Sequence, residues 1–151
     1  MTTTVIFFDL GDTLVTTKPR AWLPKAKALL SSLRQSGLRL GIISNTPDLP
    51  RTEILKLLPA DFDLSVFEAN LVLFSSEIGM EKPQRAIFDE AVKRAKVPAN
   101  QCLFCTENIL DTLMAQLVGM HSIRVQTAPN SDLANLPKTI ADFQSLSATK
   151  A

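Results

Sequence analysis

The chain has 151 residues, 46% of them hydrophobic, and its 16 basic and 15 acidic side chains leave a formal net charge of +1. This length predicts a single domain over residues 1–151 with a full hydrophobic core. The balanced charge gives no basic surface for nucleic acid. No apolar run approaches the roughly 18 residues of a membrane-spanning helix, so neither nucleic acid nor a membrane is expected as a partner.

The first predicted element is a strand at residues 5–8. Four apolar residues, Val5 to Phe8, run without a break into Asp9, a pattern typical of a parallel strand that is buried on both faces. Ligands of open parallel sheets bind just beyond the carboxyl ends of the strands. Asp9 therefore lies where chemistry is expected, although an aspartate at this point could also simply cap the following turn.

The rest of the chain alternates between helical and strand patterns, with Trp22 early in the first helix. Helices are predicted at 23–33, 51–58, 83–95 and 110–118, further strands at 38–43, 71–75, 101–105 and 122–125, and irregular segments at 18–21, 61–70 and 77–81. This alternation predicts an α/β fold with a parallel sheet covered on both faces.

Two cysteines, Cys102 and Cys105, fall on one predicted strand, where their spacing puts the side chains on opposite faces. We expect both to be reduced core residues. Together with the lack of a signal-peptide pattern, this predicts a cytoplasmic protein. In the C-terminal tail, a final set of apolar residues is expected to pack against the body: Ile140, Phe143 and Leu146.

Polar side chains accompany the predicted strands in a fixed order. Asp9 follows the first strand, Ser44 the second, Lys82 the third, and Glu107 and Asp111 the fourth. Because the carboxyl ends of parallel strands meet at one edge of a sheet, these groups can converge. A carboxylate can attack phosphorus and form an acyl phosphate, a hydroxyl and an ammonium can neutralise the transferred group, and carboxylates can hold Mg²⁺. The pattern predicts phosphoryl-transfer chemistry.

These residues lie in or near the segments FFDLGDTLV, IGMEKPQRAIFDEA and LVGMHSIRV, and they resemble the four ordered motifs of the haloacid dehalogenase superfamily, most of whose members are phosphatases. The resemblance covers roughly residues 4–146. A receiver domain of two-component signalling has similar chemistry, but it carries its phosphorylated aspartate after the third strand.

The resemblance implies a Rossmannoid three-layer fold with a five-stranded parallel sheet in the order 5-4-1-2-3, and Mg²⁺ as cofactor. It implies that Asp9 is the nucleophile. The other implied roles are metal binding by Asp9, the Gly11 carbonyl, Glu107 and Asp111, catalysis by Ser44 and Lys82, and substrate binding by Asn45 and Thr46.

The chain departs from the family pattern at two places. The general acid/base of the phosphatases usually stands two residues after the nucleophile, where this chain has Gly11, and such a group contributes typically 10²- to 10⁴-fold in rate. Asp12 could turn into the site instead, but adjacent side chains diverge, which favours a surface or turn position. The second departure is Thr106-Glu107, where family members usually have Gly-Asp.

The spacing of the motifs leaves no room for a cap domain, since only 34 residues separate Asp9 from Ser44 and 37 separate Ser44 from Lys82. A capless site resembles family members that act on macromolecules or borrow a lid from a neighbouring subunit, so a homo-oligomer is considered. A dehalogenase is disfavoured by the absent cap.

Our first interpretation is a Mg²⁺-dependent phosphohydrolase that acts through an aspartyl phosphate on a phosphorylated small molecule or macromolecule. Its site would be weak or specialised because Gly11 replaces the acid. The alternative is a catalytically silent binding or regulatory module of the same fold.

Overall fold

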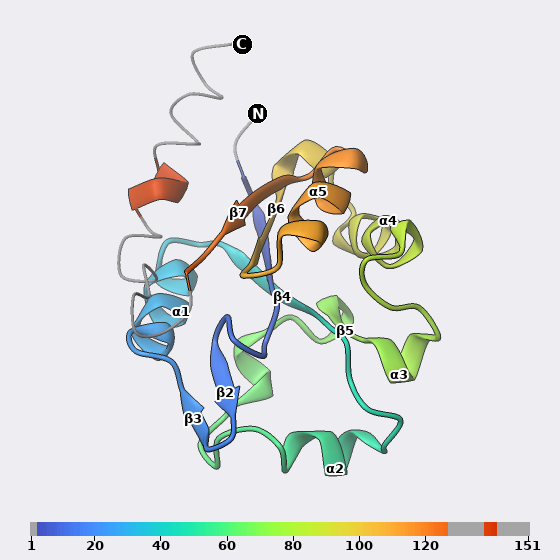
Figure 1. Cartoon of the computed structure of the whole chain (residues 1–151). Helices are drawn as coiled ribbons and strands as arrows, with labels where there is room; N and C mark the ends of the chain where they lie inside the picture. The colour runs from blue at the N-terminus through green and yellow to red at the C-terminus, as the bar shows by residue number, and fades with distance from the viewer. Residues whose placement is uncertain (1–2, 127–137, 142–151) are drawn as a thin grey trace.

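The computed structural model describes residues 3–126 and 138–141 (Figure 1). Its central sheet has five parallel strands in the order β5 (Val72–Phe74), β4 (Arg39–Ser44), β1 (Val5–Phe8), β6 (Cys102–Thr106) and β7 (His121–Arg124). Counted along the chain and read from the β7 edge, these strands have the predicted order 5-4-1-2-3. The predicted α/β fold is therefore confirmed.

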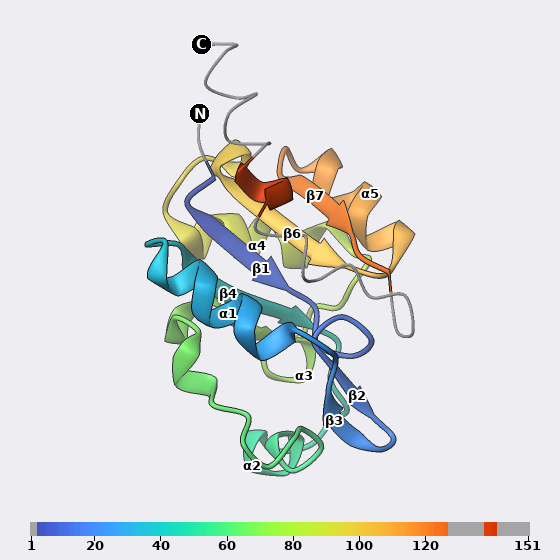
Figure 2. The same ribbon diagram turned by 90° about the vertical axis from the view of Figure 1, so that its left-hand side faces the viewer.

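Helices cover both faces of this sheet (Figures 1 and 2). On one face α1 (Ala26–Gln35) packs against alternate strand residues such as Ile6 and Phe8. On the other face α4 (Arg85–Ala95) and α5 (Ile109–Leu117) pack against the intervening residues. Successive side chains of a strand point to opposite faces, so an unbroken apolar run is what a sheet covered on both faces requires.

The two cysteines behave as predicted. Cys105 belongs to the core on the α1 side of the sheet and Cys102 to the core on the α4 side, and neither forms a disulfide. Burial raises the pKa of the Cys102 thiol to about 11. Ile140 also packs into the α1-side core as expected, whereas Phe143 and Leu146 lie outside the described residues.

The segment after β1 forms a hairpin that the sequence analysis did not anticipate. Strands β2 (Val15–Thr17) and β3 (Arg20–Trp22) pair antiparallel, where a polar link and a helix start were predicted. Trp22 therefore lies on a strand, where its ring stacks on Phe62 with a centroid separation of 5.1 Å. Its indole nitrogen donates to Asp61 Oδ1 at 2.8 Å, so a contact from 39 residues away fixes this edge of the hairpin.

The remaining elements are short. They are α2 (Arg51–Leu55), α3 (Ser75–Ile78), and the 3₁₀ turns η1 (Leu64–Val66), η2 (Ala69–Leu71) and η3 (Ala99–Gln101). Two predictions are corrected here. Residues 75–78 form the short helix α3, where the sequence predicts the end of a strand at 75 and a loop from 77. Helix α4 begins at Arg85 rather than at Pro83, so Lys82 lies in the turn that precedes the helix.

No further domain is inserted within residues 3–126, in agreement with the predicted absence of a cap. The chain makes only the β2–β3 hairpin between β1 and α1, and only α3 and a turn between β5 and α4. Among the described residues, none of the helices has the length and hydropathy to cross a membrane.

Close packing inside the sheet generates the first prediction, which concerns Gly41 on β4. A Cβ at this position would lie 2.6 Å from Phe7 Cδ1 and 2.8 Å from the Leu71 carbonyl oxygen. We expect Gly41→Ala to lower the free energy of unfolding by about 1–3 kcal/mol because the core is overpacked. Urea unfolding measures the change.

The matched control is Gly11→Ala, since a Cβ at Gly11 meets no atom within 4 Å. This variant should keep the wild-type stability. Equal unfolding curves for the two variants would contradict the packing seen around β4.

Candidate active site

The site is built around Asp9, the first residue after β1. Its backbone nitrogen donates to the Cys105 carbonyl at 3.0 Å, which continues the pairing of β1 with β6. Oδ1 accepts from the Leu10 backbone nitrogen at 2.8 Å, and Oδ2 accepts from the Thr106 hydroxyl at 3.2 Å. Both carboxylate oxygens are therefore held, and the side chain is buried.

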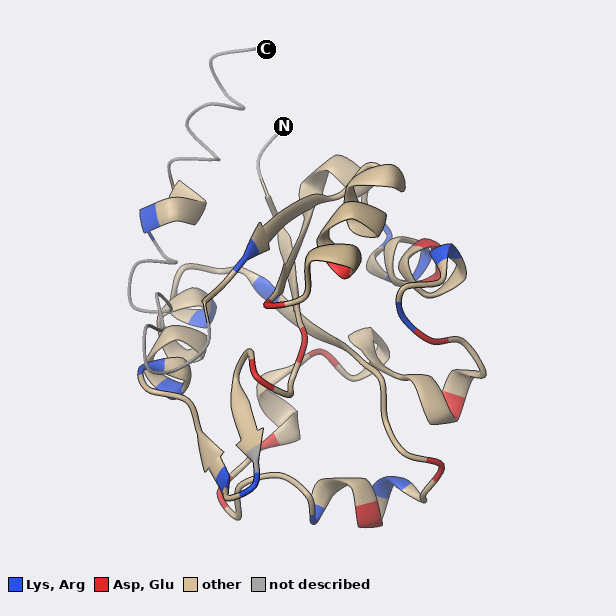
Figure 3. Ribbon diagram, viewed as in Figure 1, with Lys and Arg blue, Asp and Glu red and all other residues tan. Residues whose placement is uncertain are grey.

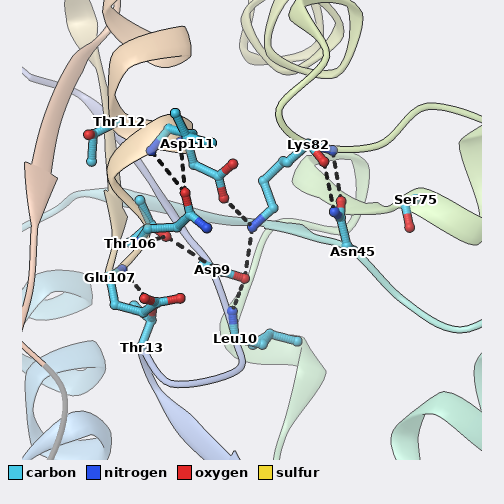
Figure 4. Close-up of polar contacts among 12 residues, drawn as sticks. Asp9, Leu10, Thr13, Asn45, Ser75, Lys82, Thr106, Glu107, Asp111 and Thr112 are labelled. Carbon is cyan, nitrogen blue, oxygen red and sulfur yellow. Dashed lines mark hydrogen bonds and ion pairs between the residues drawn. The ribbon is translucent and has the colours of Figure 1, made fainter.

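Lys82 reaches this carboxylate from the turn before α4 (Figure 4). Its ammonium lies 2.9 Å from Asp9 Oδ1 and 3.2 Å from Asp111 Oδ2, and its side chain is only 4% exposed. A lysine can be buried to this extent because it is paired with two opposite charges. The ammonium therefore bridges the carboxylates that follow β1 and β6.

Asn45 fixes the position of Lys82. Its side-chain amide donates to the Lys82 carbonyl at 2.9 Å, and its Oδ1 accepts from the Lys82 backbone nitrogen at 2.8 Å. This reciprocal pair, which we call the Asn45–Lys82 clamp, ties the end of β4 to the turn before α4. Two residues that the order of the motifs assigns to one site are thus joined by direct contact.

Asp111 is placed by the start of α5. Asn108 caps this helix, because its Oδ1 accepts from the backbone nitrogens of Leu110 and Asp111 at 2.9 and 3.2 Å. The cap sets the helix so that Asp111, in its first turn, points inward and is 5% exposed. Leu110 points outward and is 59% exposed.

These groups surround one cavity of about 270 Å³, which we call the Asp9 cavity. Of the predicted site residues, Asp9, Gly11, Ser44, Asn45, Lys82 and Asp111 line it. The sequence analysis missed three further lining residues: Pro83, Asn108 and Leu110. The position of Asn108, just before a helical apolar pattern, is the helix-cap signal that could have identified it.

Thr46 and Glu107 are not among the residues that line the Asp9 cavity. Thr46 turns toward α3, where its hydroxyl lies 2.7 Å from Ser76 Oγ. Glu107 is half-buried beside Thr13, whose hydroxyl accepts from the Glu107 backbone nitrogen at 3.2 Å. Figure 4 shows its carboxylate apart from that of Asp111.

Acidic residues follow the ends of β1 and β6 (Figure 3), and their side chains affect one another. Burial raises the pKa of Asp111. The nearby Lys82 ammonium lowers this pKa, and the Asp9 carboxylate raises it further. Burial also raises the pKa of Glu107, as do Asp9, Asp12 and Asp111. The folded protein keeps these carboxyl groups protonated at pH values where the unfolded chain has released the protons. As the pH rises from the ordinary carboxyl pKa through the raised pKa values, the contribution of both groups to the free energy of unfolding therefore falls.

The expected cluster of three carboxylates is not formed. Among the described residues, no three His, Cys, Asp or Glu side chains are arranged to hold a metal ion. Lys82 already pairs with both Asp9 and Asp111, and Glu107 is not among the residues that line the Asp9 cavity. The oxygen donors of the Asp9 cavity still fit Mg²⁺ by type, because this ion needs only one or two carboxylates beside waters and phosphate oxygens.

The two departures from the family pattern have different structural consequences. Gly11 does not have a positive φ, and the space beside it is open. Asp12 takes the left-handed conformation with φ 58° and is exposed in the turn, as the surface interpretation expects. Thr106 is fully buried and donates to Asp9, so the residue noted only as a deviation orients the central carboxylate.

Comparison with known proteins agrees with this architecture. A family model described as haloacid dehalogenase-like hydrolase matches residues 21–119, a range that includes Ser44, Lys82 and Asp111. The chain belongs to this family of hydrolases. Asp9 precedes the matched range, so its place in the candidate site depends on its contacts with Lys82 and Thr106.

Two curated relatives match by sequence. The haloacid dehalogenase-like hydrolase domain-containing protein 3 of Xenopus laevis is 34% identical over 72% of this chain and 43% of its own length. The glyceraldehyde 3-phosphate phosphatase of Pyrococcus abyssi is 35% identical over 67% of this chain and 41% of its own length. The chain thus spans about two fifths of the length of these relatives.

Solved structures share the fold. A haloacid dehalogenase family enzyme from Bacteroides thetaiotaomicron, in complex with magnesium and inorganic phosphate, superposes with a TM-score of 0.69 at 15% identity. The similarity covers 85% of this chain and 96% of that one. At this identity the comparison supports the arrangement of elements alone.

The second prediction concerns the buried ammonium. Lys82→Met should lower the free energy of unfolding in EDTA by about 3–5 kcal/mol, because it leaves the buried carboxylates of Asp9 and Asp111 without the ammonium that pairs with them. Mg²⁺ should then stabilise the variant more than the wild type, since the metal no longer competes with an ammonium. Urea unfolding with EDTA and with Mg²⁺ provides both values.

Lys93→Met is the matched control, because Lys93 is exposed on α4 and lies away from the Asp9 cavity. It should leave the unfolding curves unchanged in both solutions. A Lys82→Met protein as stable as the control in EDTA would show that Lys82 does not neutralise the carboxylates.

Proposed function

We propose that the chain is a phosphatase-type hydrolase in which Asp9 is the nucleophile toward a phosphate monoester. The observation that carries the proposal is the convergence of Asp9, Ser44 and Lys82 on one cavity at the carboxyl end of the sheet. Membership of a hydrolase family supports it, as do a relative that is a sugar-phosphate phosphatase and a structural neighbour that holds phosphate.

In the proposed reaction an Asp9 carboxylate oxygen forms a bond to phosphorus while the bond from phosphorus to the leaving oxygen breaks. The leaving group departs with the electron pair of that bond and takes a proton from solvent water. A second water then attacks the phosphorus of the aspartyl phosphate and gives up a proton to solvent, the bond from phosphorus to the Asp9 oxygen breaks, and inorganic phosphate and the carboxylate are released.

The surrounding groups fit the charges of this reaction. Ser44 lines the cavity and is 5% exposed, so its hydroxyl would donate to a phosphate oxygen bound there. The Lys82 ammonium is positioned to share its charge between Asp9 and the phosphate. Thr106 holds the other oxygen of Asp9, which keeps the attacking oxygen directed into the cavity.

Asp9, Asp111 and the Gly11 carbonyl are the groups that would hold Mg²⁺. Bound there, the ion would supply positive charge that screens Asp9 from the phosphate it attacks. Glu107 is left out of this proposed set because it does not line the Asp9 cavity.

The second candidate function is a phosphate-binding module without useful turnover. The observation that favours it is Gly11, because no acid stands where relatives protonate the leaving group, and Asp12 is exposed in a turn. Both candidates predict phosphate and metal binding, and they differ only in hydrolysis.

The third prediction separates them. The wild-type chain with Mg²⁺ should hydrolyse an aryl phosphate, whose leaving group needs little help from an acid. EDTA and Asp9→Asn should each reduce the rate to background, because they remove the metal and the nucleophile. A folded wild type that hydrolyses no member of a broad panel of phosphate esters supports the silent module instead.

The fourth prediction concerns the missing acid. Gly11→Asp should raise kcat for an alkyl phosphate by about 10-fold or more and raise it less for an aryl phosphate, since an alkoxide needs protonation most. The backbone at Gly11 accepts a side chain without strain or clash, so the variant should fold as the wild type does.

Gly11→Asn is the matched control, because asparagine has nearly the same shape as aspartate but no acidic proton to transfer to the leaving group. It should leave the ratio of alkyl to aryl rates unchanged. A folded Gly11→Asp protein that binds Mg²⁺ and gains nothing on alkyl phosphates would mean that the acid is not what limits this site.

A further inference from the structure

A second cavity of about 330 Å³ lies beside the Asp9 cavity, and we call it the Thr46 cavity. Its lining is polar and comes from the segments after β4, around α3 and before α4: Thr46, Asp48, Ser75, Ser76, Gly79, Met80, Glu81 and Gln84. Small-molecule sites in proteins have volumes of about 300–1,000 Å³. The Thr46 cavity reaches this size.

The two cavities share a wall. Asn45 and Lys82 line the Asp9 cavity, and their chain neighbours Thr46 and Glu81 line the Thr46 cavity. The Asn45–Lys82 clamp therefore separates the two, with Asn45 exposed at the surface. Figure 4 shows Ser75 on the far side of this clamp from Asp9. A substituent on a phosphate bound at Asp9 can pass over Asn45 into the second cavity.

The hydroxyl groups of the Thr46 cavity are placed firmly and keep hydrogen-bonding capacity. Ser75 Oγ accepts from the Thr46 backbone nitrogen at 2.8 Å, and Thr46 Oγ1 accepts from the Ser76 backbone nitrogen at 3.2 Å. Thr46 Oγ1 and Ser76 Oγ share one hydrogen bond of 2.7 Å. Whichever hydroxyl donates, the other keeps its hydrogen, so the pair offers a ligand both a donor and acceptor lone pairs.

The charge of this cavity is negative. Asp48 and Glu81 contribute carboxylates, no Lys or Arg lines the cavity, and neither acid forms an ion pair with any residue in 3–126 or 138–141. The Lys82 side chain points away from it, toward Asp9 (Figure 4). An anionic substituent would therefore meet repulsion here, whereas hydroxyl and ammonium groups would meet acceptors.

We propose that the Thr46 cavity binds the leaving group of the substrate, and that this group carries hydroxyl or ammonium donors and no negative charge. The inference rests on the proposed phosphatase function and adds a substrate class to it. It assigns Thr46 to the leaving group rather than to the phosphate. The competing path for the leaving group runs along Leu110, the exposed apolar wall of the Asp9 cavity, which would favour aryl or alkyl groups.

The test measures binding by calorimetry in Mg²⁺, with Asp9→Asn as the parent so that no ester is consumed. Glycerol 3-phosphate and 3-phosphoglycerate form the central pair, because they differ by a hydroxymethyl group in place of a carboxylate. We expect the parent to bind glycerol 3-phosphate about tenfold more tightly. O-Phosphoethanolamine, which carries an ammonium, distinguishes the contribution of the carboxylates from that of the hydroxyls, and should also bind more tightly than 3-phosphoglycerate.

Two charge-matched variants of this parent complete the design. Asp48→Asn with Glu81→Gln should remove most of the preference for glycerol 3-phosphate over 3-phosphoglycerate. Glu53→Gln with Asp89→Asn removes the same charge from exposed positions on α2 and α4 and should keep the preference. Equal affinities for the two esters in the parent, a preference that survives in both variants, or no binding at all would each overturn the inference. So would phenyl phosphate binding more tightly than the polar esters.

Hydrolysis of an aryl phosphate by the wild type is measured separately, so that the two failures can be told apart. A chain that hydrolyses the aryl ester but shows no preference in binding has the proposed function without this leaving-group site. A chain that hydrolyses nothing, yet loses its binding preference only in Asp48→Asn with Glu81→Gln, has the site without the phosphatase function.

Discussion

The ammonium of Lys82 between two carboxylates is the interaction on which the site depends. Asp9 and Asp111 follow different strands, and both are buried at the edge where the strands end. Two buried negative charges at this spacing would repel each other, and each would lose its hydration. Lys82 offsets both effects with contacts of 2.9 Å to Asp9 and 3.2 Å to Asp111.

The rest of the local structure serves to keep this lysine and its partners in place. The Asn45–Lys82 clamp holds the backbone of the lysine with two hydrogen bonds, which leaves the ammonium directed at Asp9. The Asn108 cap sets α5, and Thr106 holds the second oxygen of Asp9. Each of these residues sits at the end of a strand or the start of a helix, where backbone groups without regular partners are available. The parallel sheet thus supplies the positions, and short side-chain-to-backbone contacts supply the orientation.

The sheet could be predicted from the sequence because burial on both faces leaves a local signal. Val5 to Phe8 is apolar at every position, as a strand buried on both faces of a sheet requires. Once the strands are known to be parallel, Asp9, Ser44 and Lys82 are expected to converge at one edge of the sheet. The β2–β3 hairpin could not be predicted in this way. Trp22 is held by Phe62 and Asp61, about 40 residues further along, and no local pattern shows that contact.

Side-chain direction was the other limit of prediction. Thr46 and Glu107 stand next to residues that line the Asp9 cavity, yet neither of them lines it. The Thr46 hydroxyl instead contacts Ser76, a residue from another part of the chain. Order and spacing along the chain specify which segment reaches the site, but not which way an individual side chain faces once it is there.

The two departures from the family pattern, Thr106 and Gly11, both concern the chemistry of the Asp9 carboxylate. In the proposed reaction, the Thr106 hydroxyl would favour attack by fixing Asp9, while Gly11, which supplies no acid, would disfavour departure of a basic leaving group. A leaving group with neighbouring hydroxyl or ammonium substituents reduces this second cost, because electron-withdrawing groups make the departing alkoxide less basic. The polar Thr46 cavity and the missing acid therefore point to the same kind of substrate from independent parts of the structure. A phosphate ester of a simple alkanol would lack both the binding partners at Thr46 and the inductive help, and it should be the poorest substrate of this site.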